Sequence, residues 1–192
     1  MKPLLFLLIF ILWYLSCDRD FPERQMTAGT QEAPGTATGT SKKNDSIHKV
    51  TFSPPPVPIN TADVTPEKIV DFAKTLVGVP YKYGSVNPSD GFDCSGFITY
   101  VFSNFNIKVP RSSVEFTNVG EEIRLPYAKT GDLILFTGTD STIQIVGHMG
   151  IVTENTDTLR FIHSTSGKKY GVTVTPLGAY YMKRFVKVVR IF

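Results

Sequence analysis

Hydrophobic and polar positions divide the chain into stretches of different character. An uncharged apolar run fills residues 3–15, and a polar stretch without a hydrophobic period follows to about residue 60. Apolar residues then recur at helical spacing, and short apolar runs separated by turn formers continue to the C-terminus. Helices followed by short strands predict one α+β domain over residues 61–192, with the helices packed on an antiparallel sheet.

Two helices of this domain have clear boundaries. Thr65 and Pro66 suit the N-cap and the first position of a helix that ends before Gly78. A second helix is expected over residues 94–104, where the apolar positions fall on one stripe. A third, shorter helix is expected near residues 113–119.

The second half of the domain predicts five strands. Each is rich in β-branched or aromatic residues and is bounded by turn formers. The expected strands are residues 132–137, 148–153, 159–164, 171–176 and 185–191. Beside the last of them, we expect Tyr180, Tyr181 and Phe185 to be core residues.

The N-terminus has the pattern of an export signal. The apolar run at residues 3–15 would rise roughly 20 Å as a helix, which is too short for the bilayer core of roughly 30 Å. It ends in Leu15-Ser16-Cys17, which resembles a bacterial lipobox, although Tyr14 stands where such motifs prefer leucine. We expect a lipoprotein-type signal peptide over residues 1–16 and a lipid on Cys17. The alternative is an ordinary export signal followed by an unmodified cysteine.

Residues 17–60 are expected to form a flexible tether between the lipid anchor and the domain. Threonine, glycine, serine, lysine and proline dominate this stretch, which ends in a proline-rich segment at residues 54–58. His48 lies within it, and we expect this histidine to be solvated and to have no catalytic role. These features predict an exported protein that is anchored to a bacterial membrane and faces the periplasm, or is secreted if Cys17 is unmodified.

Composition narrows the classes of function. The 192 residues include 42% hydrophobic residues, enough for a core, and carry a formal net charge of +3. Charges of both signs are mixed along the chain, so a nucleic-acid partner is not expected. Two cysteines cannot form a disulfide scaffold, and no cysteine and histidine cluster has the spacing of a zinc site. We therefore expect no metal and no cofactor.

The sharpest chemical feature is the segment Gly91-Phe92-Asp93-Cys94-Ser95-Gly96 at the start of the second predicted helix. The positive end of a helix favours a thiolate, the reactive form of cysteine. Asp93 can cap the helix, and the small Ser95 and Gly96 leave room for a substrate backbone. The alternatives for Cys94 are a buried structural thiol and a disulfide with Cys17.

Two of the three histidines lie on adjacent predicted strands. If a two-residue turn at 156–157 connects these strands, Gly150 faces His163. His148 and His163 then project from the same face as diagonal neighbours, with Cα atoms roughly 7–8 Å apart. A loop with an odd residue count would place them on opposite faces. A cysteine nucleophile needs a base, and the base needs a group that orients its ring, so this register favours a catalytic arrangement.

Four motifs in order resemble the NlpC/P60 cysteine peptidases, and most of all the small murein-endopeptidase lipoproteins of Gram-negative bacteria. The motifs are Asp93-Cys94-Ser95-Gly96, residues 131–136, His148-Met149-Gly150-Ile151 and residues 161–164. The similarity extends to residues 78–84, 109–113 and 181–190, so it covers nearly the whole domain. Ser85 stands where the family often has glycine and Phe116 where it commonly has glutamine, departures that bear on substrate preference.

The resemblance implies a papain-like α+β fold and hydrolysis of peptide bonds in the stem peptides of bacterial peptidoglycan. It assigns Cys94 as the nucleophile, His148 as the base and His163 as the residue that orients His148. The main-chain N–H of Cys94 would assist the oxyanion.

The resemblance also implies that Tyr81, Asp93 and Ser95 help to shape the substrate site. Arg111 is a further candidate for substrate binding because stem peptides are acidic. Its alternative role is a contact to a carbonyl or carboxylate of the protein itself.

The bond that is cut stays open between the γ-D-glutamyl–diamino acid link within a stem and the D-alanyl–diamino acid crosslink between stems. A non-catalytic peptidoglycan-binding module is one alternative function, and an acyltransferase or lipid hydrolase on the same fold is another. The expected partners are stem peptides and, through the lipid anchor, a membrane. We expect a monomer.

Overall fold

The computed structural model describes residues 55–192. The predicted signal peptide, Cys17, His48 and most of the predicted tether lie outside the described residues, so the division of the chain at residues 16 and 60 stays a prediction. Between residues 55 and 192, none of the helices combines the length and the apolar character needed to cross a membrane.

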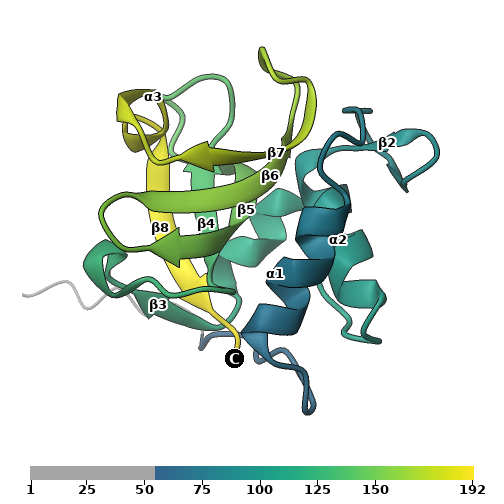
Figure 1. Cartoon of the computed structure of the whole chain (residues 1–192). Helices are drawn as coiled ribbons and strands as arrows, with labels where there is room; N and C mark the ends of the chain where they lie inside the picture. Colours follow the sequence, from purple (N-terminus) through teal and green to yellow (C-terminus); the bar gives the residue numbers. More distant parts are fainter. Residues whose placement is uncertain (1–54) are drawn as a thin grey trace, which may run out of the picture. The chain divides into compact units, whose positions relative to one another are not determined.

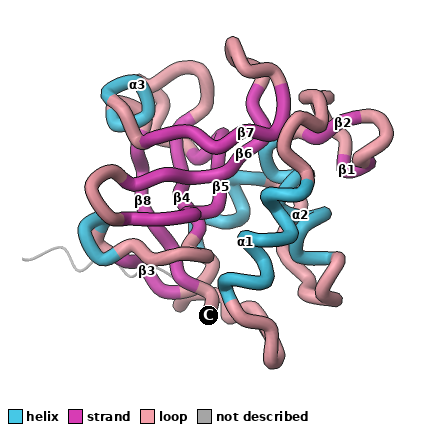
Figure 2. The backbone as a smooth tube through the Cα atoms, in the orientation of Figure 1, coloured by secondary structure: helices cyan, strands magenta, loops and turns pink. Residues whose placement is uncertain are grey.

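Helices come first in the described part of the chain and most strands come later (Figures 1 and 2). The helices are α1 (Pro66–Thr75), α2 (Cys94–Ser103) and α3 (Ala179–Met182), with the 3₁₀ helices η1 (Ser113–Asn118) and η2 (Leu125–Tyr127). The strands are β1 (Val86–Asn87), β2 (Gly91–Phe92), β3 (Glu121–Ile123), β4 (Leu133–Thr137), β5 (Val146–Asn155), β6 (Leu159–Thr165), β7 (Gly171–Pro176) and β8 (Phe185–Arg190).

Six strands form one antiparallel sheet in the order β3-β8-β4-β5-β6-β7. Figure 1 shows α1 and α2 together on one side of this sheet. The α+β class and the five strands predicted from the sequence are therefore confirmed. The prediction missed β3, the short β1–β2 pair and the single-turn α3, because these elements are too short to produce a hydrophobic period.

The first helix ends where the sequence predicts and leads directly toward the site. Gly78 adopts a positive φ of 94°, which suits glycine, and its N–H donates to the carbonyl of Val172 at 2.9 Å. The N–H of Val172 donates in turn to the carbonyl of Val79 at 2.8 Å. The segment between α1 and α2 is thereby fixed to the start of β7.

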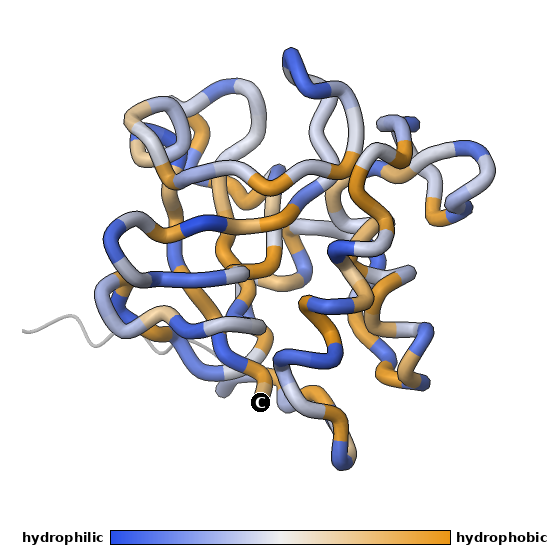
Figure 3. The backbone as a smooth tube through the Cα atoms, in the orientation of Figure 1, coloured by the Kyte–Doolittle hydropathy of each residue, from blue (hydrophilic) through white to orange (hydrophobic). Residues whose placement is uncertain are grey.

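Apolar side chains form two clusters, one on each face of the sheet. The first lies between the helices and the sheet and includes the fully buried Phe97 and Val101 of α2. The second, on the other face, includes Phe136 and Phe161. Strand β4 is buried along its whole length because apolar clusters cover both faces of the sheet, and Figure 3 shows apolar residues on both the strands and the helices.

Of the three aromatic residues expected in the core near β8, two pack against the second cluster and one does not. Tyr181 and Phe185 are partly buried against that cluster. Tyr180 is 63% exposed, so the prediction for Tyr180 is wrong. Its hydroxyl accepts a hydrogen bond from Arg184 at 2.7 Å, and this contact keeps it at the surface.

The register of β5 and β6 agrees with the prediction near the histidines and differs at the turn. Asn155 pairs with Leu159, so three residues form the loop instead of the predicted two. A bulge between Val152 and Glu154 takes up the extra residue, and Ile151 pairs with Ile162. This pairing continues the register in which Gly150 faces His163. The bulge therefore compensates for the odd loop that would otherwise separate the two histidines.

The folded part of the chain begins earlier than residue 61. The N–H of Val57 donates to the carbonyl of Asn118 at 2.7 Å, and the N–H of Gly120 donates to the carbonyl of Val57 at 3.1 Å. Ile59 packs against the first apolar cluster. The end of the proline-rich segment is thus attached to the domain.

Candidate active site

The candidate nucleophile is the first residue of α2. The carboxylate of Asp93, the N-cap residue, accepts a hydrogen bond from the N–H of Gly96 and so satisfies one free donor of the first turn. Gly96 has no room for a side chain, because a Cβ there would collide with the carbonyl of Ser85. The residue before β1 and the helix end are therefore in close contact, and Cys94 is held at the surface of this junction, half-buried.

The sulfur of Cys94 lies against the backbone of β5. It is 3.8 Å from the carbonyl oxygen of Gly147, and the N–H of Met149 also interacts with it. In the described sheet, β5 pairs with β6 only from Ile151 onward, while its earlier half pairs with β4. Cys94 occupies the side of β5 that β6 leaves free, next to the two residues that flank His148.

A hydroxyl ties the nucleophile segment to the strand that carries the second histidine. Ser164, which is fully buried, donates to the carbonyl of Phe92 at 2.7 Å. The N–H of Lys82 donates to the same carbonyl at 3.0 Å. Since Phe92 precedes Asp93 and Ser164 follows His163, these bonds fix the distance between α2 and β6.

The two histidines form a direct hydrogen bond. His148 Nε2 lies 2.8 Å from His163 Nδ1, and both side chains are buried. Three aromatic rings surround the pair: Phe136 beside His148, Phe161 beside His163, and Tyr181 against both. The bond to His163 engages Nε2 of His148, so Nδ1 is the nitrogen of His148 left to take a proton.

This dry environment keeps both imidazoles neutral. Burial lowers the pKa of His148 to about 3, with a further lowering from the guanidinium of Arg184. Burial also lowers the pKa of His163 well below its usual value, and His148 and Arg184 add to the effect. Arg184 is itself buried and donates to the carbonyl of Thr137 at 2.9 Å. Among the described residues, no carboxylate forms an ion pair with Arg184 to offset this charge.

The thiol also rests in its neutral form. Burial raises the pKa of Cys94 to about 11, and the carboxylate of Asp93 raises it further. The N–H groups of Ser95, Cys94 and Met149 act in the opposite direction, but they are outweighed. The helix end therefore favours the thiolate, as expected, but burial and the carboxylate of Asp93 have the larger effect on the pKa of Cys94.

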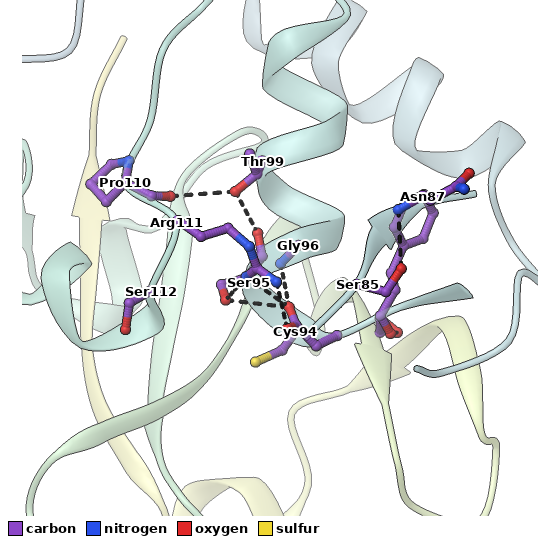
Figure 4. Close-up of polar contacts among 12 residues, drawn as sticks. Ser85, Asn87, Cys94, Ser95, Gly96, Thr99, Pro110, Arg111 and Ser112 are labelled. Atoms are coloured by element: carbon purple, nitrogen blue, oxygen red, sulfur yellow. Dashed lines mark hydrogen bonds and ion pairs between the residues drawn. The ribbon is translucent and has the colours of Figure 1, made fainter. Parts of the chain in front are cut away.

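Arg111 contacts a carboxylate of the protein itself. Its guanidinium donates to both oxygens of Asp93, at 3.1 and 2.7 Å, and to the hydroxyl of Ser95 at 3.0 Å. Figure 4 shows Arg111 beside Ser95, with the sulfur of Cys94 directed away from this group. The Arg111 side chain remains 42% exposed. Its predicted contact to the substrate stays a prediction, and the observed bonds orient Asp93.

Tyr81 borders the site from the loop before β1. Its backbone forms a bridge with Phe92, and its ring meets the edge of Tyr170 with centroids 6.1 Å apart. Burial raises the pKa of Tyr81, and the charges of Cys94 and Asp93 raise it further. The structure therefore places Tyr81 close to the candidate nucleophile, as a substrate-binding residue requires.

The sequence pattern pointed to Cys94, His148 and His163. In the structure the two histidines are in contact, and the sulfur of Cys94 lies against the residues that flank His148. The sequence pattern did not point to Ser164, Arg184 or Thr175. Their residue types are common on any protein surface or sheet, and their contacts join segments far apart in the sequence, so no local pattern could have identified them. Between residues 55 and 192, no group of three or more histidine, cysteine, aspartate or glutamate residues is placed to hold a metal ion.

Helices on one face of an antiparallel sheet, with a cysteine at a helix N-terminus beside paired histidines, define a papain-like α+β protein. The chain belongs to the NlpC/P60 family, whose model matches residues 78–190. The family and the fold expected from the motifs are thereby confirmed.

Two named proteins and one crystal structure are also similar to this chain. The chain is 34% identical over 133 residues to the gamma-DL-glutamyl hydrolase of Bacillus subtilis, covering 69% of this chain and 32% of that protein. It is 30% identical over 118 residues to the murein DD-endopeptidase MepS/murein LD-carboxypeptidase of Escherichia coli, covering 61% and 57%. It resembles the crystal structure of an NlpC/P60 family protein from Bacillus cereus with a TM-score of 0.59 and 26% identity, covering 67% and 40%. The chain thus spans about a third of the first relative and just over half of the second.

The low pKa values of the buried histidines predict a loss of stability in mild acid. Below pH 6.5, His148 and His163 bind protons in the unfolded chain but not in the folded chain. The free energy of unfolding therefore falls as the pH is lowered. By pH 5 His148 accounts for about 2 kcal/mol of this loss, and His163 adds to it in the same direction. We expect His148→Gln to reduce the loss between pH 7.5 and pH 5 by about that amount in urea unfolding.

His48→Gln is the matched control, because we predict this histidine to be solvated in both states. Its pH dependence should equal that of the parent chain. Parallel curves for His148→Gln and His48→Gln would show that His148 titrates normally in the folded protein.

Proposed function

We propose that this protein is a cysteine peptidase that hydrolyses stem peptides of peptidoglycan. The observation that carries the proposal is the position of the Cys94 sulfur, at the start of α2 and against the residues that flank His148, with His148 bonded to His163. Membership of the NlpC/P60 family and the names of the two relatives indicate the substrate class.

The geometry supports acyl transfer through a thiol. In the proposed reaction, Nδ1 of His148 takes the proton of Cys94 as the sulfur attacks the carbonyl carbon of the scissile bond. The backbone N–H groups of Cys94 and Ser95, at the unpaired start of α2, stabilise the oxyanion. His148 then gives its proton to the leaving amine, and water releases the peptide from the sulfur.

The names of the two relatives refer to different peptide bonds, so the experiment must also identify which bond this protein cuts. One relative is named for γ-DL-glutamyl hydrolysis and the other for cleavage of a murein DD bond. The two candidate substrates share a diamino acid and differ in the group before it. Side chains at the rim, such as Tyr81 and the Asp93–Arg111 pair, are the candidates that distinguish them.

Digestion of purified peptidoglycan followed by mass spectrometry tests the proposal. We expect the wild-type chain to release fragments cut at one of the two candidate bonds, and we expect Cys94→Ala to lower the rate by at least about 10³-fold because no nucleophile remains. Sedimentation with insoluble peptidoglycan measures binding in parallel, and Cys94→Ala should bind as the wild type does.

The alternatives give different results in these assays. Binding without cleavage by the wild type would favour a non-catalytic wall-binding module. Release of fatty acids from a lipid panel, with stem peptides left intact, would favour a lipid hydrolase. Unchanged cleavage by Cys94→Ala would remove Cys94 as the nucleophile.

We also propose that the protein is exported and anchored by a lipid on Cys17, with residues 17–60 as the tether. The support is the sequence pattern alone, an apolar run that ends in Leu15-Ser16-Cys17. In Cys17→Ala the protein should move from the membrane fraction to the soluble fraction on cell fractionation, and wild-type chain should take up radiolabelled palmitate. An equal membrane content of the two proteins would contradict the lipid anchor. The monomeric state also remains a prediction.

A further inference from the structure

The hydrogen-bonded chain of the site continues one residue beyond the histidine pair. His163 Nε2 lies 3.0 Å from the hydroxyl oxygen of Thr175, on β7. We propose that Thr175 is a positioning residue that accepts the Nε2 hydrogen of His163 and thereby stabilises the tautomers in which His148 takes a proton at Nδ1. The inference deepens the proposed function, on which it rests.

The tautomers of the two rings are coupled through their shared bond. If His148 is to accept a proton at Nδ1, its own hydrogen must be on Nε2, and Nε2 must donate to Nδ1 of His163. His163 then carries its hydrogen on Nε2, which needs an acceptor. Thr175 Oγ1 is that acceptor at 3.0 Å. With the opposite tautomers, Nδ1 of His148 carries a hydrogen and cannot act as a base.

The hydrogen bond between His163 and Thr175 is stronger once Cys94 has transferred its proton to His148. Charged His148 has hydrogens on both nitrogens, so it can only donate to His163 and thereby fixes the Nε2–H form of His163. The hydroxyl of Thr175 then accepts a hydrogen bond from His163, which is itself hydrogen-bonded to the imidazolium of His148. Hydrogen bonds next to a charged group are stronger than those between neutral groups. Thr175 therefore stabilises the charged intermediate more than the resting pair, and its contribution appears in the reaction rate.

The place of Thr175 in the sheet suits an acceptor. Strand β7 is at the edge of the sheet, and Thr175 is only partly buried, so its own hydrogen can point to solvent while its oxygen receives His163. In the register of β6 and β7, Thr175 pairs with Phe161 and Thr173 pairs with His163. Both threonines lie on the face of His163, but in the described structure the ring bonds to Thr175. Thr173 is therefore a matched control on the same strand.

The test compares Thr175→Val, Thr175→Ser and Thr173→Val in the full chain. Valine keeps the shape of threonine and removes the acceptor, whereas serine restores it. We expect Thr175→Val to lower kcat for stem-peptide cleavage about 5- to 30-fold with little change in KM. Thr175→Ser should recover most of this loss, and Thr173→Val should behave as wild type.

A second readout does not need the natural substrate. The rate at which iodoacetamide alkylates Cys94, followed by mass spectrometry of the peptide that contains it, measures proton transfer from the thiol to His148 across a range of pH. We expect Thr175→Val to slow this alkylation at pH 7 and to displace its pH profile, and Thr175→Ser to restore both. If wild type alkylates as described but cleaves no stem peptide, the proposed function fails while the role of Thr175 stands.

Equal alkylation profiles and equal kcat for Thr175→Val and wild type would overturn the proposal. A loss in Thr175→Val that Thr175→Ser does not recover, or an equal loss in Thr173→Val, would also overturn it, because either result indicates a disturbance of β7. Should Thr175→Val fold poorly by thermal unfolding, Thr175→Ala removes the same acceptor and takes its place.

Discussion

The 2.8 Å hydrogen bond between His148 and His163 is the interaction on which the rest of the site depends. It aligns Nδ1 of His148 for a proton and removes both rings from water. The bond persists only in a dry setting, which Phe136, Phe161 and Tyr181 provide by packing around the two rings. The same burial, together with the charge of Arg184, lowers the pKa of both rings and keeps them neutral at rest. The second apolar cluster therefore keeps the ring of His148 neutral, with Nδ1 available to take a proton.

The helix that carries Cys94 is positioned by a separate set of polar contacts. Asp93 caps the helix, and Arg111 holds both oxygens of its carboxylate. Ser164 bonds the segment before the helix to the residue beside His163. These contacts place the sulfur on the side of β5 that β6 leaves free. Because β6 does not pair with this part of β5, the sulfur of Cys94 reaches the two residues that flank His148.

Much of this arrangement could be predicted from the sequence, because its main signals are local. The start of α2 follows from Asp93 and the apolar stripe after it, and each long strand has its own run of β-branched residues. The pairing of His148 with His163 was expected for a partly mistaken reason. The loop between their strands has three residues. A bulge between Val152 and Glu154, which no local sequence pattern predicts, restores the register.

The remaining features depend on contacts between distant segments. The acceptor role of Thr175 requires the register of β6 and β7, and the partner of Arg111 requires the packing of the segment after α2 against its start. The net effect of burial on the Cys94 pKa also could not be foreseen from the helix position alone. For the segment before residue 55, the predicted leader and tether depend on composition and motif only.

The central claim is that both imidazoles rest neutral and that each carries its hydrogen on Nε2. Two-dimensional ¹H–¹⁵N NMR of the chain labelled with ¹⁵N at histidine reads tautomer and charge directly, and His148→Gln and His163→Gln assign the signals. At pH 7 the account predicts that both rings are neutral with an unprotonated Nδ1, and that they remain neutral at pH 5.5. An imidazolium signal from His148 at pH 7, or a hydrogen on its Nδ1, would contradict the account.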